Sequence, residues 1–259
     1  MLNIIYRSRF IVFFSIFILI LSCSKLNKKT SPFKIIVVLC DLSESTRNMR
    51  NIYFKSFKEI ISSIGHGDAI YVVKITESSI EEPEIPIKEV FPEFIPKDKF
   101  GNPTDNPLIV KRERKKADEK LRRKKEKCIE DAERLFFSRE RILKTDILSS
   151  LLVAEKIFKN FPEKKPILVI LSDMIEDSSD YNFKKEKLTK ERIREIIENE
   201  KSKGRLPDLR GVKVYVIGAQ ARDKEKFFSI QNFWMNYFKE CGAILEKKNY
   251  GSALIKFEE

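Results

Sequence analysis

The chain alternates between short, continuous apolar segments and longer segments in which apolar residues recur every three or four positions. Continuous apolar runs indicate buried strands, whereas the longer spacing indicates amphipathic helices. The pattern predicts strands at 33–40, 69–75, 166–171 and 212–217, an edge strand at 85–91, and a short last strand that begins at 243. It predicts helices within 49–64, 147–158, 189–203 and 227–238. This alternation favours an α/β fold with a doubly wound, mostly parallel central sheet and helices on both faces.

An insertion at about 92–141 interrupts the alternation. A proline-rich loop leads into the segment Lys111–Lys127, which has 11 basic and 4 acidic residues. Good helix formers with little apolar periodicity predict a charged, solvated surface helix from about Glu113 to Phe137. The segment's net charge of +7 is more than half of the chain's +12, so the overall basicity alone does not indicate a nucleic-acid-binding protein.

The first 22 residues resemble a secretory signal peptide. Arg7 and Arg9 precede an apolar run of 12 residues, which is short for a membrane span of about 20 residues. The run ends in Ile20-Leu21-Ser22-Cys23, which resembles the lipobox of bacterial lipoproteins. The resemblance implies that Cys23 is lipidated, that residues 23–32 form a tether, and that residues 33–259 form a domain held at the bacterial cell envelope, on its periplasmic or cell-surface side. The alternative is an uncleaved N-terminal anchor with an incidental cysteine.

The other cysteines and the histidine predict no disulfide framework and no zinc site. Cys40, Cys128 and Cys241 are odd in number and widely spaced. We expect Cys40 and Cys241 to be small buried hydrophobic residues, whereas the sequence does not place Cys128. His66 is the only histidine, in a glycine-rich turn where we expect it to be exposed, and a multi-histidine zinc site is therefore excluded.

Three oxygen-bearing side chains follow the first predicted strand in the pattern D-x-S-x-S: Asp41, Ser43 and Ser45. A parallel sheet binds ligands beyond the carboxyl ends of its strands, where the strand order reverses. A carboxylate and two hydroxyls are hard donors that suit Mg²⁺, Mn²⁺ or Ca²⁺. Taken alone, the pentapeptide is more typical of a turn or a helix cap.

Two more residues are predicted at the same edge of the sheet. Thr145 opens the helix that precedes the third long strand, and Asp173 ends that strand. With Asp41, Ser43 and Ser45, this set resembles the metal-ion-dependent adhesion site of the von Willebrand factor A domain, over residues 33–257.

The resemblance implies a role for each of the five residues. Ser43 and Ser45 would bind the metal directly, Thr145 directly or through water, and Asp41 and Asp173 largely through water. A carboxylate from a partner protein would complete the coordination. The chain departs from the family at Glu44 and at Met174, where many members have glycine. Glu44 either stays in solvent or reaches the ion.

The resulting hypothesis is a membrane-tethered, divalent-metal-dependent protein-binding module that is not an enzyme. A phosphatase or hydrolase using Asp41 is the alternative, although such enzymes usually have a second carboxylate where Ser43 stands. Lys111–Lys127 is compatible with anionic lipid or with no ligand, and less so with nucleic acid, because it has no interleaved aromatic residues. The acidic loop 176–182 has two interpretations, the rim of the site or a solvated surface loop, and we favour the solvated loop.

Overall fold

The computed structural model describes residues 33–253, apart from residues 78, 140, 141 and 143. The predicted signal peptide, the tether and Cys23 lie outside the described residues, as do residues 254–259. The boundaries proposed for these segments therefore stay predictions. Within the described part, no helix is both long enough and apolar enough to cross a membrane.

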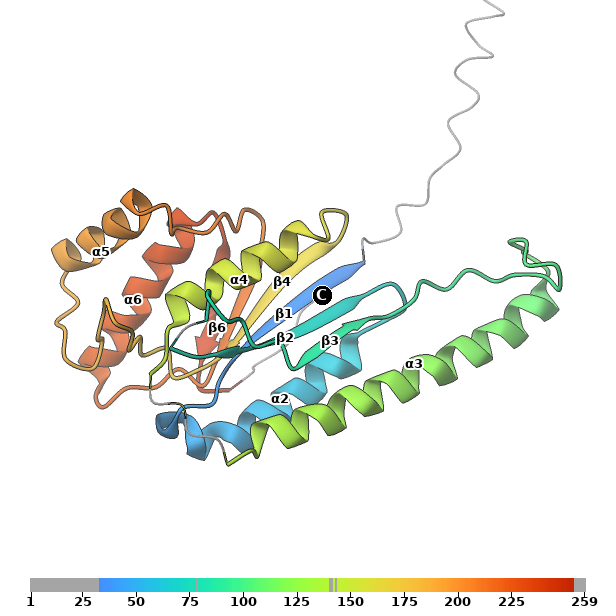
Figure 1. The fold of residues 1–259 in the computed structure, drawn as a ribbon, viewed down its shortest axis with the longest axis horizontal. Helices are drawn as coiled ribbons and strands as arrows, with labels where there is room; N and C mark the ends of the chain where they lie inside the picture. Colours follow the sequence, from blue (N-terminus) through green and yellow to red (C-terminus); the bar gives the residue numbers. More distant parts are fainter. Residues whose placement is uncertain (1–32, 78, 140–141, 143, 254–259) are drawn as a thin grey trace, which may run out of the picture. The chain divides into compact units, whose positions relative to one another are not determined.

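A six-stranded sheet forms the centre of the domain, in the order β3-β2-β1-β4-β5-β6 (Figure 1). All neighbouring strands are parallel except β2 and β3. The chain moves outward from β1 to β2 and β3 and then crosses to the other side of β1 at β4, so the strand order reverses between β1 and β4. The strands are β1 Lys34–Asp41, β2 Ala69–Ile75, β3 Ile87–Val90, β4 Lys165–Leu171, β5 Lys213–Ile217 and β6 Ile244–Gly251.

Helices cover both faces of the sheet because the strands bury both of their faces. Alternate residues of a strand point to opposite faces. Ile36 and Val38 of β1 pack in one cluster with α2 and α3, whereas Val37 and Leu39 pack in the other with α4, α5 and α6. The helices are the short η1 Glu44–Met49, α2 Arg50–Ser63, α3 Pro107–Phe136, α4 Ile147–Lys159, α5 Lys190–Ser202 and α6 Lys224–Glu240. The predicted fold class is confirmed.

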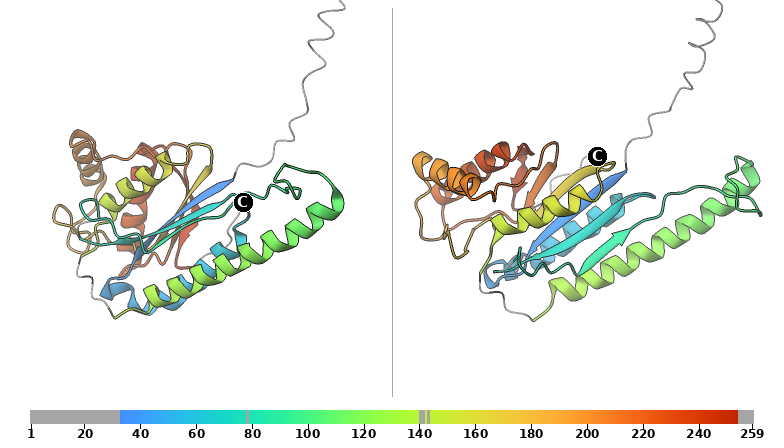
Figure 2. Two further views of the ribbon diagram at one scale, coloured as in Figure 1. Left: turned by 45° about the vertical axis from the view of Figure 1, so that its right-hand side comes forward. Right: turned by 45° about the horizontal axis from the view of Figure 1, so that its top comes forward.

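The inserted helix α3 is longer than predicted. It begins at Pro107, six residues before Glu113, because the Asn106 side chain accepts a hydrogen bond from the main-chain N–H of Leu108 and proline suits the first helical position. Only its first part is solvated on most sides. Toward its end, Cys128, Ala132 and Phe136 are buried against α2, so the insertion is anchored on the domain (Figures 1 and 2).

His66 differs from its expected exposure. Its side chain is 11% exposed, and Nε2 lies 2.8 Å from Oδ1 of Asp118 on α3. The turn that carries His66 lies at the end of the sheet where β1 begins, because Asp68 accepts a hydrogen bond from the Lys34 main chain. The histidine therefore joins the insertion to the domain, at the end of the sheet opposite to Asp41.

Candidate metal centre

Asp41 ends β1 with its carboxylate fully buried. Its Oδ1 accepts a hydrogen bond of 2.9 Å from the main-chain N–H of Ser43, and its Oδ2 accepts one of 2.9 Å from the Ser172 hydroxyl. Burial raises the pKa of Asp41, and these hydrogen bonds oppose the rise. Both carboxylate oxygens are thus held by donors of the chain itself, an arrangement that does not favour Asp41 as a free nucleophile.

A chain of short oxygen–oxygen contacts links the serine loop to the end of β4. The hydroxyls of Ser43 and Ser45 lie 3.0 Å apart, and Ser45 donates a hydrogen bond of 2.8 Å to Oδ2 of Asp173. The other oxygen of Asp173 accepts from the main-chain N–H of Ile175. Burial, reinforced by the nearby charge of Asp41, raises the pKa of Asp173 to about 6. The structure therefore brings four of the five predicted residues into one hydrogen-bonded cluster.

Two further side chains fix the backbone of the serine loop. The Thr46 hydroxyl lies 2.9 Å from the carbonyl oxygen of Asp41 and 3.0 Å from that of Ser43. Arg50 donates from Nη2 to the carbonyl of Leu42 at 2.8 Å, and from Nη1 to the carbonyl of Ser138 in the insertion. Because Arg50 and Thr46 are both buried, the loop keeps a defined conformation at the sheet edge.

Thr145 reaches the same edge through its backbone. Its N–H and C=O both pair with the main chain of Asp177, at 3.0 and 2.9 Å, and nearby Ile142 forms a parallel bridge with Ser43. Thr145 is therefore buried between the serine loop and the segment that follows β4. In the described part of the chain, no side-chain hydrogen bond joins Thr145 to the other four residues.

Glu44 lies outside the cluster. Its side chain is 66% exposed, and its Oε1 accepts a hydrogen bond of 2.9 Å from Nη1 of Arg47. Of the two positions left open by the sequence, the structure shows the solvent-facing one. Glu44 therefore adds no carboxylate to the cluster of Asp41 and Asp173.

Met174 has a left-handed backbone, with φ of 66°, which is typical of glycine. Such a conformation costs a larger residue about 1–2 kcal/mol. Its neighbours hold it in place: its N–H donates to the Ser172 hydroxyl, its carbonyl accepts from the indole N–H of Trp234, and its side chain is fully buried. This conformation gives a physical reason for glycine at this position in the family that the sequence resembles.

Glu176 corrects the expectation of a solvated acidic loop. Its side chain is fully buried, and Oε2 accepts hydrogen bonds from the main-chain N–H groups of Ile147 and Leu148 at the start of α4. Burial, together with the charge of Asp146, raises its pKa well above the ordinary value. The loop after β4 is thereby fastened to the helix that follows Thr145.

Ser172 and Tyr53 are site neighbours that the sequence analysis missed. Ser172 orients Asp41, and its position directly before Asp173 could have indicated this role. Tyr53 recurs at the spacing of buried residues in a helix, and that pattern gave no indication that its hydroxyl lies near the site. That hydroxyl is buried without a hydrogen-bond partner among the described residues, and burial and the charges of Asp41 and Asp173 raise its pKa. A Cβ at Gly218, whose φ is 100°, would come within 2.4 Å of this hydroxyl, so glycine leaves it room.

The donor set fits a hard divalent cation. Two carboxylates and three hydroxyl side chains meet at one edge, and no lysine or arginine among the described residues forms an ion pair with Asp41 or Asp173. The orphaned Tyr53 hydroxyl is a further polar group without a partner there. Within the described ranges, no group of three or more His, Cys, Asp or Glu side chains is placed to hold a metal ion, so a metal at this edge would depend on hydroxyl oxygens.

The fold and this edge define a doubly wound α/β domain with an oxygen-rich centre at the reversal of strand order. No protein-family model matches the sequence, and no curated protein matches it. Its neighbours among solved structures include a von Willebrand factor type A protein and a protein with a metal-ion-dependent adhesion-site motif.

Three of these neighbours illustrate how distant the likeness is. Proximal thread matrix protein 1 from the mussel byssus, with a zinc-occupied adhesion-site motif, is 16% identical with a TM-score of 0.41, over 78% of this chain and 43% of that one. A von Willebrand factor type A protein from Catenulispora acidiphila is 14% identical with a TM-score of 0.40, over 82% and 42%. BatB from Bacteroides thetaiotaomicron is 12% identical with a TM-score of 0.35, over 72% and 66%.

This chain spans about two fifths of the length of the first two neighbours. The fold assignment rests on the strand order and on the register of the sheet.

Proposed function

We propose that the chain is a membrane-tethered module that binds a partner protein through a divalent metal ion. The observation that supports this proposal is the linked cluster of Asp41, Ser43, Ser45 and Asp173, in which neither buried carboxylate forms an ion pair with a described residue. The charge of Lys184 lowers the pKa of both acids, but burial outweighs it and both pKa values stay raised. Buried acids without a paired cation are costly unless they are protonated or bind a metal. A divalent ion would satisfy both carboxylates at once.

In this proposal Mg²⁺ is the resident ion, with Mn²⁺ or Ca²⁺ as substitutes. Ser43, Ser45 and Thr145 would offer hydroxyl oxygens, while Asp41 and Asp173 would balance the charge. The bound ion would supply a positive centre for a carboxylate of the partner protein. Ser172 orients Asp41, and Arg50 and Thr46 hold the loop, so little rearrangement would accompany binding.

The experiment is a pull-down with the full chain from envelope extracts, with Mg²⁺ and with EDTA. We expect a partner that is retained in Mg²⁺, eluted by EDTA, and lost in Asp173→Asn. Asp180→Asn serves as the control, because Asp180 is an acid of the same domain that pairs with Arg205 instead. A partner that stays bound in EDTA, or that binds Asp173→Asn as strongly as wild type, would contradict the proposal.

The tether is the second part of the proposal. Cys23 would carry the lipid, and the ten residues from Cys23 to Pro32 would let the domain stand up to about 35 Å from the membrane surface. Two acyl chains give stable anchoring where one is marginal. Metabolic labelling with a radioactive fatty acid tests this point: we expect label on the wild type and none on Cys23→Ala.

The basic helix α3 supports a second contact with the membrane. Its first turns extend past the end of the sheet where β1 begins, which is the end that continues into the tether (Figure 2). Lys111 and Lys115 in these turns are exposed, as is Lys127 further along the helix. Near an anionic surface each lysine contributes about 1 kcal/mol. The metal cluster lies at the opposite end of β1, where it would face a partner.

Vesicles test this contact. The full chain should bind vesicles containing phosphatidylglycerol more tightly than phosphatidylcholine vesicles, and the triple variant Lys111→Gln, Lys115→Gln, Lys127→Gln should lose this preference. The tether acts in both kinds of vesicle, so the difference reports on α3. An unchanged preference in the variant would refute a contact through α3.

A further inference from the structure

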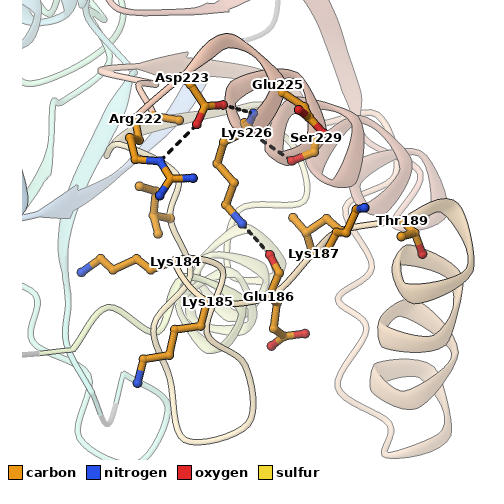
Figure 3. Close-up of a pocket in the computed structure, with 13 residues that line it drawn as sticks. Lys184, Lys185, Glu186, Lys187, Thr189, Arg222, Asp223, Glu225, Lys226 and Ser229 are labelled. Carbon is orange, nitrogen blue, oxygen red and sulfur yellow. Dashed lines mark hydrogen bonds and ion pairs between the residues drawn. The ribbon is translucent and has the colours of Figure 1, made fainter.

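A cavity of about 570 Å³ lies beside the candidate metal centre, between the loop that precedes α5 and the start of α6 (Figure 3). Its size is within the range of ligand pockets, about 300–1,000 Å³. Five cationic side chains line it: Lys184, Lys185, Lys187, Arg222 and Lys226. We call it the lysine pocket, after Lys184, Lys185, Lys187 and Lys226.

The lysine pocket adjoins Asp173 through two residues of its wall. Ile175 lines the pocket and donates its main-chain N–H to Oδ1 of Asp173 at 2.9 Å. Ala221 also lines the pocket, and the preceding residue, Gln220, directs its N–H at the carbonyl of Asp173. A ligand in the pocket would therefore lie next to any group bound at the metal centre.

The acids of the lysine pocket are mostly occupied by other partners. Glu186 forms an ion pair of 2.7 Å with Arg192, which lies on α5. Asp223 caps α6 through the main-chain N–H of Lys226 and also pairs with Arg222. Glu225 remains as an exposed acid on the wall.

Three of the four lysines, by contrast, have no carboxylate partner among the described residues, and the fourth, Lys184, pairs with Asp177. Lys185 and Lys187 form no ion pair within the described part of the chain, and Lys226 donates to the main-chain carbonyl of Glu186. Lys184 reaches Asp177 only at 3.5 Å, with half of its side chain exposed. Burial and the charge of Arg222 lower the pKa of Lys226. The lysine pocket is thus a place where positive charge exceeds what the chain itself neutralises.

We propose that the lysine pocket binds acidic side chains of the partner protein that neighbour the carboxylate at the metal centre. This inference rests on the proposed function and names its partner chemistry: an acidic segment in which one carboxylate reaches the metal and the next ones lie against the lysines. The metal would provide affinity, and the lysine pocket would select partners with consecutive acids.

The arrangement of the cations favours carboxylates on a chain over a phosphate group. In Figure 3 the amino groups of Lys184 and Lys185 point away from Lys226 on one side and that of Lys187 lies on the other side, so the lysines do not converge on one point. Phosphate sites commonly present a bidentate arginine or converging N–H groups. Here Arg222 is engaged by Asp223, and Asp223 also occupies the start of α6. Separate lysines on flexible stems suit several charges spaced along a peptide.

The test is fluorescence anisotropy of labelled hexaglutamate with the full chain in Mg²⁺. The triple variant Lys185→Gln, Lys187→Gln, Lys226→Gln should bind the peptide about fivefold more weakly than wild type. The matched control is Lys55→Gln, Lys156→Gln, Lys247→Gln, which removes the same charge from exposed lysines outside the pocket and outside α3 and should change binding less than about twofold. Melting in Mg²⁺ checks that the pocket variant keeps the fold and the metal response.

Three results would overturn the inference: equal peptide binding by the pocket variant and wild type, equal weakening by the pocket and control variants, or displacement of the peptide by inorganic phosphate at matched ionic strength. Failure of the proposed function has a different signature. In that case EDTA would leave hexaglutamate binding to wild type unchanged, while the lysine dependence would persist.

Discussion

Two pairs of acids in this domain differ in whether an ion pair neutralises them. Asp180 and Glu200 share Arg205, whose Nη2 lies 2.5 Å from an oxygen of each, and the hydrogen bond from Arg205 lowers the pKa of Asp180. Asp41 and Asp173 have only hydroxyls and main-chain N–H groups as hydrogen-bond partners, and the pKa of each is raised. One pair has its cation in an ion pair, whereas the other forms no ion pair with any residue that the structure describes.

The difference separates a structural ion pair from a site that needs an outside charge. Breaking the first pair should harm the fold and leave the metal response intact. Changing the second should remove the metal response. The four predictions that follow test this contrast.

Arg205→Met should have the largest effect. It leaves the Glu200 carboxylate, whose side chain is 3% exposed, without its cation. Removing one partner of a buried ion pair costs about 3–5 kcal/mol, and the partial exposure of Arg205 places the expected loss near 3 kcal/mol. Urea unfolding measures it. If Mg²⁺ stabilises the variant less than it stabilises wild type, the two pairs are not independent.

Addition of Mg²⁺ should stabilise the wild-type domain against thermal unfolding. At about 100 times the dissociation constant the gain is about 2.7 kcal/mol, because the ion binds the folded state alone. Asp173→Asn should lose this gain and Asp180→Asn should keep it. Melting in Mn²⁺, measured in the same way, should show the same dependence on Asp173. A gain of the same size in Asp173→Asn would place the ion elsewhere.

The metal-free domain should become less stable as pH rises from 4.5 to 7. The folded pKa of Asp173, about 6, exceeds its ordinary value of 3.8, so its contribution is full below pH 3.8 and is lost as pH rises through 6. Over this interval the loss is about 2 kcal/mol. Asp180 has a lowered pKa, and its contribution is lost only in more acid solution. Urea unfolding in EDTA should show a flatter profile for Asp173→Asn than for Asp180→Asn; equal profiles would contradict the assignment.

Glu44→Gln should have the smallest effect. Glu44 is exposed and pairs with Arg47 three residues away, and such surface pairs are worth less than about 0.5 kcal/mol. The melting temperature and the response to Mg²⁺ should both stay close to wild type. A stronger response to Mg²⁺ would mean that Glu44 turns toward the ion when the ion is present.

The strands, the order of the helices and the approach of Asp41 to Asp173 could be predicted from the sequence. Buried strands such as β1 and β4 are continuous apolar runs, and parallel strands place their carboxyl ends at one edge. The start of α3 could have been found from Asn106 and Pro107, a cap followed by proline.

Other features of the site could not be predicted, because they depend on contacts between distant segments. The local sequence of Glu176 looks solvated, and its burial follows from the helix start that it meets at Ile147. The hydroxyl of Tyr53 is similar: helical spacing places the ring in the core but does not show that Asp41 and Asp173 lie nearby. Likewise, the left-handed backbone of Met174 is held by hydrogen bonds with Ser172 and Trp234, which the local sequence does not show.

The pairing of β1 with β4 has a consequence for the order of assembly. Ile35 aligns with Pro166, about 130 residues later, and β2, β3 and the whole insertion lie between them. Closing so long a loop is slow compared with forming local helices. During synthesis, Asp41, Ser43 and Ser45 therefore emerge long before Asp173 exists. Before β4 pairs with β1, the nascent chain lacks Asp173 at the sheet edge. A metal ion would therefore be coordinated only late in folding, after β4 has joined the sheet.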